Sequence, residues 1–171
     1  ERLAGDSQLA AETATGNYAV EAVEVMDRIA REVEPWMSET SNMHIEDATG
    51  RYPAITMAIV RAATQIAASG QFKAIIVFTL SGRTARLLGG CYPKVPILAI
   101  TPSNECCRAM NLYRGVCPVQ MPFPGDSDQM LIEAERILVE RGLLEVGDEV
   151  VVVAGFTELR GVANMVKVIR I

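Results

Sequence analysis

The 171-residue sequence contains one histidine and four cysteines, so it offers few ligands for a metal ion or members for a nucleophilic triad. Cys91, Cys106, Cys107 and Cys117 form no C-x-x-C pair, whereas structural zinc sites take about four closely spaced Cys and His ligands. We therefore interpret the cysteines as reduced thiols. A Ser-His-Asp triad would need His44, which lies in a polar stretch typical of a loop, and a solvated loop histidine is the simpler interpretation.

Long apolar runs and basic clusters are also missing. The apolar stretches fall well short of the ~18 residues that cross a bilayer, and no charged start with an apolar core indicates a signal peptide. We therefore expect a cytoplasmic protein with no membrane partner. The net charge is −5 and the 16 basic residues are scattered. Because nucleic-acid binding needs concentrated positive charge, we expect no nucleic-acid partner.

The familiar glycine motifs of nucleotide-binding proteins are absent as well. The chain has neither a Walker loop nor G-x-G-x-x-G, and no acidic cluster with metal-ligand spacing. This disfavours a small phosphotransferase acting on its own. A hydrophobic content of 50% with 22% charged residues is nevertheless that of a globular protein, and the length suits one well-buried domain.

The sequence does contain an apolar run that ends in a turn rich in hydroxyls. Residues Ala74 to Phe78 are typical of a strand buried on both faces, and a helix is predicted to begin near Arg83. The intervening turn would receive the positive end of that helix, where phosphate binds readily. The candidate phosphate-binding residues are Thr79, Ser81, Gly82, Arg83 and Thr84. The alternative is a turn that uses Ser, Gly and Thr only to cap the helix.

The remaining pattern predicts alternating helices and strands. An amphipathic helix begins at Ala19 and is expected to stop or kink near Pro35. A second helix starts with Pro53 in its first turn and ends at Gly70. Its predicted inner face consists of Ile55, Ala58, Ile59, Ala62 and Ile66.

Further helices are predicted over 83–88, before a turn at Gly89 and Gly90, and over 104–111. Another is predicted to begin after an N-cap at Asp126 and to be closed by Gly142. Strands are expected after Pro96, within 112–120 at a sheet edge, at 149–154 in the centre of the sheet, and at 166–171. The short connection before the last strand leaves no room for a crossover helix, so this strand should be antiparallel.

Four motifs in this order resemble the C-terminal domain of pyruvate kinase. They are L-A-A-E-T-A-T-G-N-Y-A-V-E-A-V at 9–23, T-L-S-G-R-T-A at 79–85, L-Y-R-G-V-C-P-V at 112–119, and G-D-E-V-V-V-V-A-G at 147–155. The resemblance implies a three-layer α/β/α sandwich with a five-stranded, mostly parallel sheet whose last strand is antiparallel. It also implies that residues 1–16 are the end of an upstream barrel domain or a linker, and that 17–171 form the α/β domain.

In that family this domain is regulatory and contacts other subunits, whereas catalysis takes place in a separate barrel with magnesium and potassium. The resemblance therefore implies no cofactor in this chain, an inactive isolated chain and a tetrameric full-length enzyme. The family's effector loop falls on 79–84, and its closing loop on 155–164, with Gly155, Arg160 and Gly161 as candidate binding residues. Ala163 replaces the usual Thr of the closing loop. A stand-alone sugar-phosphate or nucleotide-binding module of the same fold is the alternative.

The expected effector is a phosphorylated metabolite, and the sequence favours AMP or a sugar monophosphate over fructose 1,6-bisphosphate. In relatives that respond to the bisphosphate, an Arg in the segment before Gly142 binds the second phosphate. The equivalent position here is Met130, which cannot donate a hydrogen bond and which the helical pattern places toward the core. Arg160 is the residue that could replace that contact.

Overall fold

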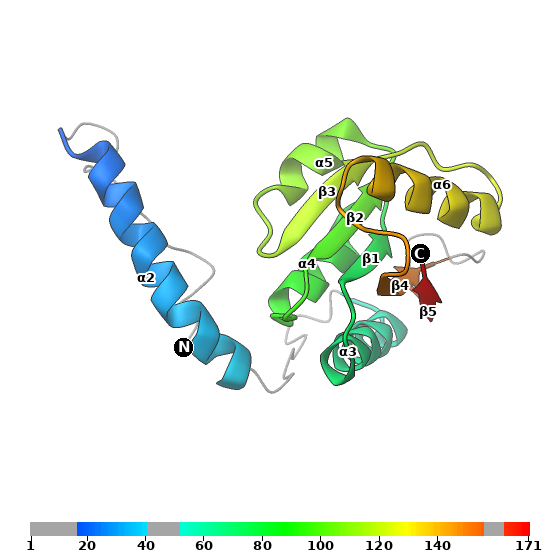
Figure 1. Cartoon of the computed structure of the whole chain (residues 1–171), viewed down its shortest axis with the longest axis horizontal. Coiled ribbons are helices and arrows are strands. Elements are labelled where there is room, and N and C mark those ends of the chain that lie inside the picture. The colour runs from blue at the N-terminus through cyan, green and yellow to red at the C-terminus, as the bar shows by residue number, and fades with distance from the viewer. Residues whose placement is uncertain (1–16, 41–51, 156–162) are drawn as a thin grey trace. The chain divides into compact units, whose positions relative to one another are not determined.

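The structure, a computed structural model, describes residues 17–40, 52–155 and 163–171. The chain divides into two compact units, residues 1–42 and 43–171. The described part of the first unit consists mainly of helix α2 (Ala19–Thr40), and the second unit carries the other helices and the strands (Figure 1). None of the helices in the described ranges is long and apolar enough to span a membrane.

Helix α2 confirms the predicted amphipathic helix. Of the predicted stop or kink near Pro35, the stop is wrong, because the helix continues to Thr40. Proline lacks a backbone N–H and therefore removes one bond of the helical ladder. The helix nevertheless continues past this position, so the loss of one bond does not end a helix of 22 residues.

The second unit contains a five-stranded sheet in the order β3-β2-β1-β4-β5. Its strands are β1 (Ala74–Phe78), β2 (Ile97–Thr101), β3 (Val116–Gln120), β4 (Glu149–Ala154) and β5 (Met165–Arg170). The first four are parallel and β5 is antiparallel to β4, as predicted. Strand β3 lies at an edge, also as predicted.

The central strand is β1, not β4. The prediction that 149–154 lies at the centre was therefore wrong, although β4 is interior, between β1 and β5. Both strands are apolar runs buried on both faces, so composition alone does not separate the middle strand from its neighbour.

Helices cover both faces of the sheet, which confirms the three-layer α/β/α fold. Helices α3 (Ala54–Ser69), α4 (Arg83–Gly90) and α5 (Asn104–Met110) contribute to one core with Ile75 and Val77 of β1. Helix α6 (Ser127–Glu140) packs on the other core with Ile76 and Phe78. Figure 1 shows α3 and α6 on opposite sides of the sheet. Alternation along a strand sends successive side chains to opposite faces, so β1 anchors both cores.

The buried face of α3 differs from the predicted one. Ile55 and Ala58 are exposed, and Pro53 precedes the helix as its N-cap. The buried residues are Thr56, Met57, Val60, Ala63, Thr64 and Ala67. Apolar residues occur almost all round this helix, so the sequence pattern does not determine which face packs against the sheet. The observed buried face is shifted by about one residue from the predicted one.

Helix α4 also runs further than predicted, through Gly89 and Gly90 rather than ending at Leu88. A Cβ atom at Gly89 would lie 2.8 Å from the carbonyl oxygen of Arg114. This glycine therefore permits close packing of helix on backbone and does not mark a turn.

Candidate functional site

The candidate phosphate loop and the start of the closing loop lie at the same edge of the sheet. Strands β1 and β4 are parallel neighbours, with Val77 opposite Val153. Thr79 and Gly155 follow the ends of these two strands. The carboxyl edge of a parallel sheet is where ligands bind in such folds, next to helix N-termini. The two loops therefore start beside one another at an edge that suits ligand binding.

The closing loop also returns to this edge. The backbone N–H of Asn164 donates to the carbonyl oxygen of Ala154 over 3.0 Å. Ala163 is buried, and its carbonyl oxygen accepts a hydrogen bond of 3.5 Å from the hydroxyl of Thr56 in α3. The last part of the loop is therefore anchored to the domain. Arg160 and Gly161, two of the predicted binding residues, lie outside the described residues.

The turn between β1 and α4 depends on a glycine and a threonine. Gly82 has φ of +73° and is the N-cap of α4, without a side-chain cap. Its N–H donates a hydrogen bond of 3.0 Å to the hydroxyl of Thr79. A Cβ at this position would lie 3.0 Å from Cγ of Met110. Both the backbone angle and the available space therefore favour glycine.

Helix α4 presents an electropositive end to this turn. Its first N–H groups have no partners within the helix, and the helix dipole adds a partial positive charge there. Its first turn contains no acidic residue, and its N-cap, Gly82, makes no side-chain hydrogen bond to the N–H groups of that turn. An anion at this point would satisfy the N–H groups and complement the dipole.

The predicted contact residues of the loop differ in accessibility. Ser81 and Arg83 are exposed, whereas Thr79 and Thr84 are only 6% and 7% exposed. The Thr79 hydroxyl already accepts from Gly82, so its structural role is to hold the turn. Ser81 and the backbone N–H groups of the first helical turn remain as the contacts best placed for a ligand, and Gly155 is exposed at the same edge.

A pocket on the outer side of α4 was missed by the sequence analysis. It has a volume of about 470 Å³ and is lined by Tyr52, Arg83, Arg86 and Tyr113. Arg83 was a predicted phosphate-binding residue, but Arg86 was not. Their spacing places the two arginines on one helical face, and this signal could have identified Arg86. The two tyrosines come from distant parts of the chain, so no local pattern pointed to them.

Met130 lies where the sequence placed it, in the core. It is 7% exposed and belongs to the cluster between α6 and the sheet. In the same cluster, the rings of Phe78 and Phe123 meet edge to face with centroids 5.9 Å apart. An apolar cluster therefore fills the position where bisphosphate-binding relatives are expected to have an Arg.

The four cysteines are free thiols and, within the described ranges, are not grouped with other potential metal ligands. Among the residues described, no group of three or more His, Cys, Asp or Glu side chains could hold a metal ion. Cys91 is buried, and this burial raises the pKa of its thiol despite a hydrogen bond with Thr64. The thiols of Cys106, Cys107 and Cys117 are partly exposed.

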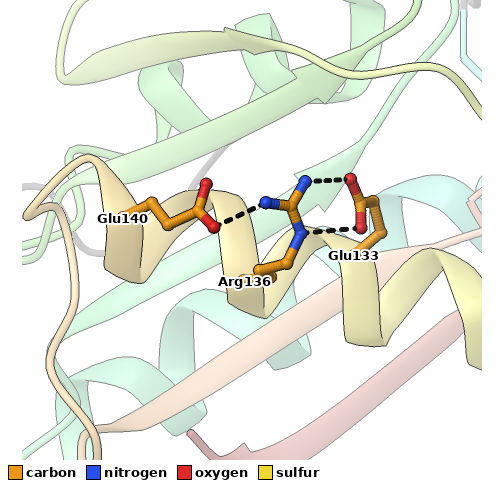
Figure 2. A network of polar contacts seen from close by, with 3 residues as sticks. All are labelled: Glu133, Arg136 and Glu140. Carbon is orange, nitrogen blue, oxygen red and sulfur yellow. Dashed lines mark hydrogen bonds and ion pairs between the residues drawn. The ribbon is translucent and has the colours of Figure 1, made fainter.

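Helix α6 carries an ion-pair network on its exposed face (Figure 2). Arg136 donates to Glu133 through Nε at 3.0 Å and Nη2 at 2.5 Å, and to Glu140 through Nη1 at 2.5 Å. The hydrogen bond from Arg136 lowers the pKa of Glu133. All three residues lie on one helix at i, i+3 and i, i+4 spacing, so the network stabilises the helix.

Residues 57–169 match the family model described as the pyruvate kinase alpha/beta domain. A pyruvate kinase of Agrobacterium vitis is 35% identical over 170 residues, covering 95% of this chain and 34% of the relative. A pyruvate kinase of Clostridium perfringens is 32% identical and covers 95% of this chain and 35% of the relative. One from Eimeria tenella is 34% identical, with coverage of 94% and 31%. The chain thus spans about a third of the length of these relatives.

Proposed function

The chain belongs to the pyruvate kinase alpha/beta domain family, and we propose that it is the effector-binding, regulatory domain of a pyruvate kinase. The phosphorylated effector binds at the loop 79–84. The full-length enzyme transfers phosphoryl from phosphoenolpyruvate to ADP in its barrel domain, which uses magnesium and potassium. It is a cytoplasmic tetramer in which these domains take part in subunit contacts.

The observation that carries this proposal is the uncapped, electropositive start of α4 at the carboxyl edge of the sheet. Gly82 places the backbone of the turn in a left-handed conformation, and no acidic side chain occupies the first helical turn. Ser81 is exposed beside it and can donate to a phosphate oxygen. These features combine the backbone donors and positive potential that phosphate requires.

The effector is a monophosphate, such as AMP or a sugar monophosphate, rather than fructose 1,6-bisphosphate. A second phosphate needs a second cation, and Met130 is buried in an apolar cluster at the position where relatives use an Arg. Burying an unpaired phosphate against apolar side chains is costly. The closing loop from Gly155, with Arg160 and Gly161, covers the bound monophosphate.

A calorimetric comparison of three ligands tests both parts of the proposal. AMP, ribose 5-phosphate and fructose 1,6-bisphosphate are titrated into the chain and into a Ser81→Asp variant, whose carboxylate repels phosphate from the loop. We expect at least one monophosphate to bind at the loop, and the variant to bind it there at least tenfold more weakly, which corresponds to about 1.4 kcal/mol. Equal binding by the variant would refute the loop as the site. Bisphosphate binding at least tenfold tighter than either monophosphate would refute the role assigned to Met130.

A further inference from the structure

The outer pocket of α4 contains two cations that the described structure leaves without acidic partners. Arg83 and Arg86 both line it and are exposed. In the part of the chain that the structure describes, no carboxylate forms an ion pair with either guanidinium. The other lining residues in the described ranges are Tyr52 and Tyr113, so the described lining carries two positive charges and no carboxylate.

The position of these two arginines in the helix is unfavourable for positive charge. They are the first and fourth residues of α4, at the positive end of the helix dipole, where a cation is unfavourable. They also repel each other, because residues three apart on a helix are neighbours. The protein has a net charge of −5, so acidic residues were available in the sequence, yet the first turn of this helix contains none. An anion in the pocket would remove both penalties.

From this geometry we propose that the pocket of Tyr52, Arg83, Arg86 and Tyr113 is a second anion site, which binds a phosphorylated metabolite that carries a ring. A phosphate monoester has a charge of about −1.5 to −2 at neutral pH, which matches two guanidinium groups. The guanidinium fork binds phosphate oxygens in pairs. The pocket of about 470 Å³ has room beyond the phosphate, and tyrosine offers both a ring face and a hydroxyl to the remainder of the ligand.

The pocket is distinct from the loop at the carboxyl edge. None of Thr79, Ser81, Gly82 and Thr84 lines it, and its contacts come from side chains rather than from backbone N–H groups. Arg83 belongs to both surfaces, because its backbone begins α4 and its side chain lines the pocket. The proposal therefore goes beyond effector binding at the loop and does not depend on it.

The test is a calorimetric titration of the full chain with AMP as the probe, using Arg86→Gln as the pocket variant and Ser81→Asp as the loop variant. Arg108→Gln is the matched control, because Arg108 is an exposed arginine on α5 outside the pocket. We expect wild type and the control to bind AMP at two sites. Arg86→Gln should keep only the loop site, and Ser81→Asp only the pocket site, with a loss of at least tenfold at the altered site.

The variants also separate the failure of one proposal from that of the other. A single wild-type site that survives in Ser81→Asp and is lost in Arg86→Gln would support the pocket and refute the loop. Three other results would overturn the pocket site. The first is a single wild-type site that is lost in Ser81→Asp and survives in Arg86→Gln. The others are a single site that is lost in both variants and the absence of AMP binding to wild type.

A stability measurement excludes a merely structural role for Arg86. Ligand-free Arg86→Gln should unfold at the same temperature as wild type or higher, because the substitution removes a cation from the positive end of the helix. A lower midpoint would show that Arg86 supports the fold, and would contradict the proposal. Arg86→Lys keeps the positive charge but loses the planar guanidinium group that binds phosphate through two hydrogen bonds. At the pocket it should therefore bind AMP more weakly than wild type and more tightly than Arg86→Gln.

Discussion

The N–H of Gly82 donates a hydrogen bond of 3.0 Å to the hydroxyl of Thr79, and this bond closes the turn between β1 and α4. Both residues are buried, so little water is available to replace the bond. This hydrogen bond therefore helps to fix the shape of the loop that is proposed to bind phosphate.

Replacing Thr79 by Val should test this bond directly. The change removes the acceptor, leaves the buried N–H of Gly82 unpaired and should lower the free energy of unfolding by about 1–3 kcal/mol. Thr79→Ser keeps the hydroxyl and is the control. Chemical denaturation of the two variants measures the difference, and equal stability of Val and Ser at this position would show that the bond contributes nothing.

Gly82→Ala should destabilise the domain by roughly 1–2 kcal/mol, because an alanine is strained at φ of +73° and its Cβ would meet Met110 at 3.0 Å. Gly90→Ala is a matched control in the same helix. Its Cβ would meet nothing within 4 Å, and alanine is the better helix former by about 0.5–1 kcal/mol. Thermal unfolding should therefore move in opposite directions for the two variants. A shift in the same direction would contradict the assigned backbone conformations.

The Arg136 network should make stability depend on acid pH. The hydrogen bond from Arg136 holds the pKa of Glu133 below its ordinary value of 4.5. A depressed carboxyl pKa stabilises the folded state above the unfolded pKa, and this contribution is lost as pH falls through the folded value. Arg136→Ala should therefore lower the temperature of the unfolding midpoint slightly at pH 7. This difference from wild type should vanish when the pH falls below the lowered pKa of Glu133.

The control for this measurement is Arg108→Ala, which removes an exposed arginine from the last turn of α5. Its effect on the midpoint should change less between pH 7 and acid than that of Arg136→Ala. A difference for Arg136→Ala that stays constant over the same range would show that Glu133 is not the titrating partner.

Thiol labelling should distinguish one cysteine from the other three. Cys91 is 5% exposed and its pKa is raised by burial, so little reactive thiolate is accessible. Cys106, Cys107 and Cys117 are partly exposed and should react first, although burial also raises the pKa of the Cys107 thiol. Labelling with a chromogenic disulfide should give three thiols in the folded chain and the fourth after unfolding. Cys91→Ala should lose only that fourth thiol, and fast reaction of all four in the wild type would contradict the packing.

The isolated chain should not produce pyruvate from phosphoenolpyruvate and ADP with magnesium and potassium present. The chain spans about a third of the length of its relatives, and the resemblance of its sequence implies that catalysis takes place in a separate barrel domain. A coupled assay of the purified chain measures pyruvate, with an enzyme that includes the barrel as the positive control. Turnover that copurifies with the isolated chain through several columns would refute this expectation.

Much of the secondary structure followed from neighbouring residues. The apolar run of β1 predicted a strand buried on both faces, and the short connection before β5 predicted its antiparallel direction. The loop 79–84 was identified from its hydroxyls, glycine and helix start, and the structure places that helix start at Arg83. These features depend on the order of adjacent side chains, which the sequence contains in full.

The tertiary structure alone decided which elements and side chains meet. It placed β1 rather than β4 at the centre, rotated α3 so that Met57 is buried and Ile55 exposed, and brought Tyr52 and Tyr113 beside Arg86. The physical reason is the same in each case. Strand order, helix rotation and a shared pocket depend on packing between residues far apart in the chain, and several arrangements satisfy the same local pattern.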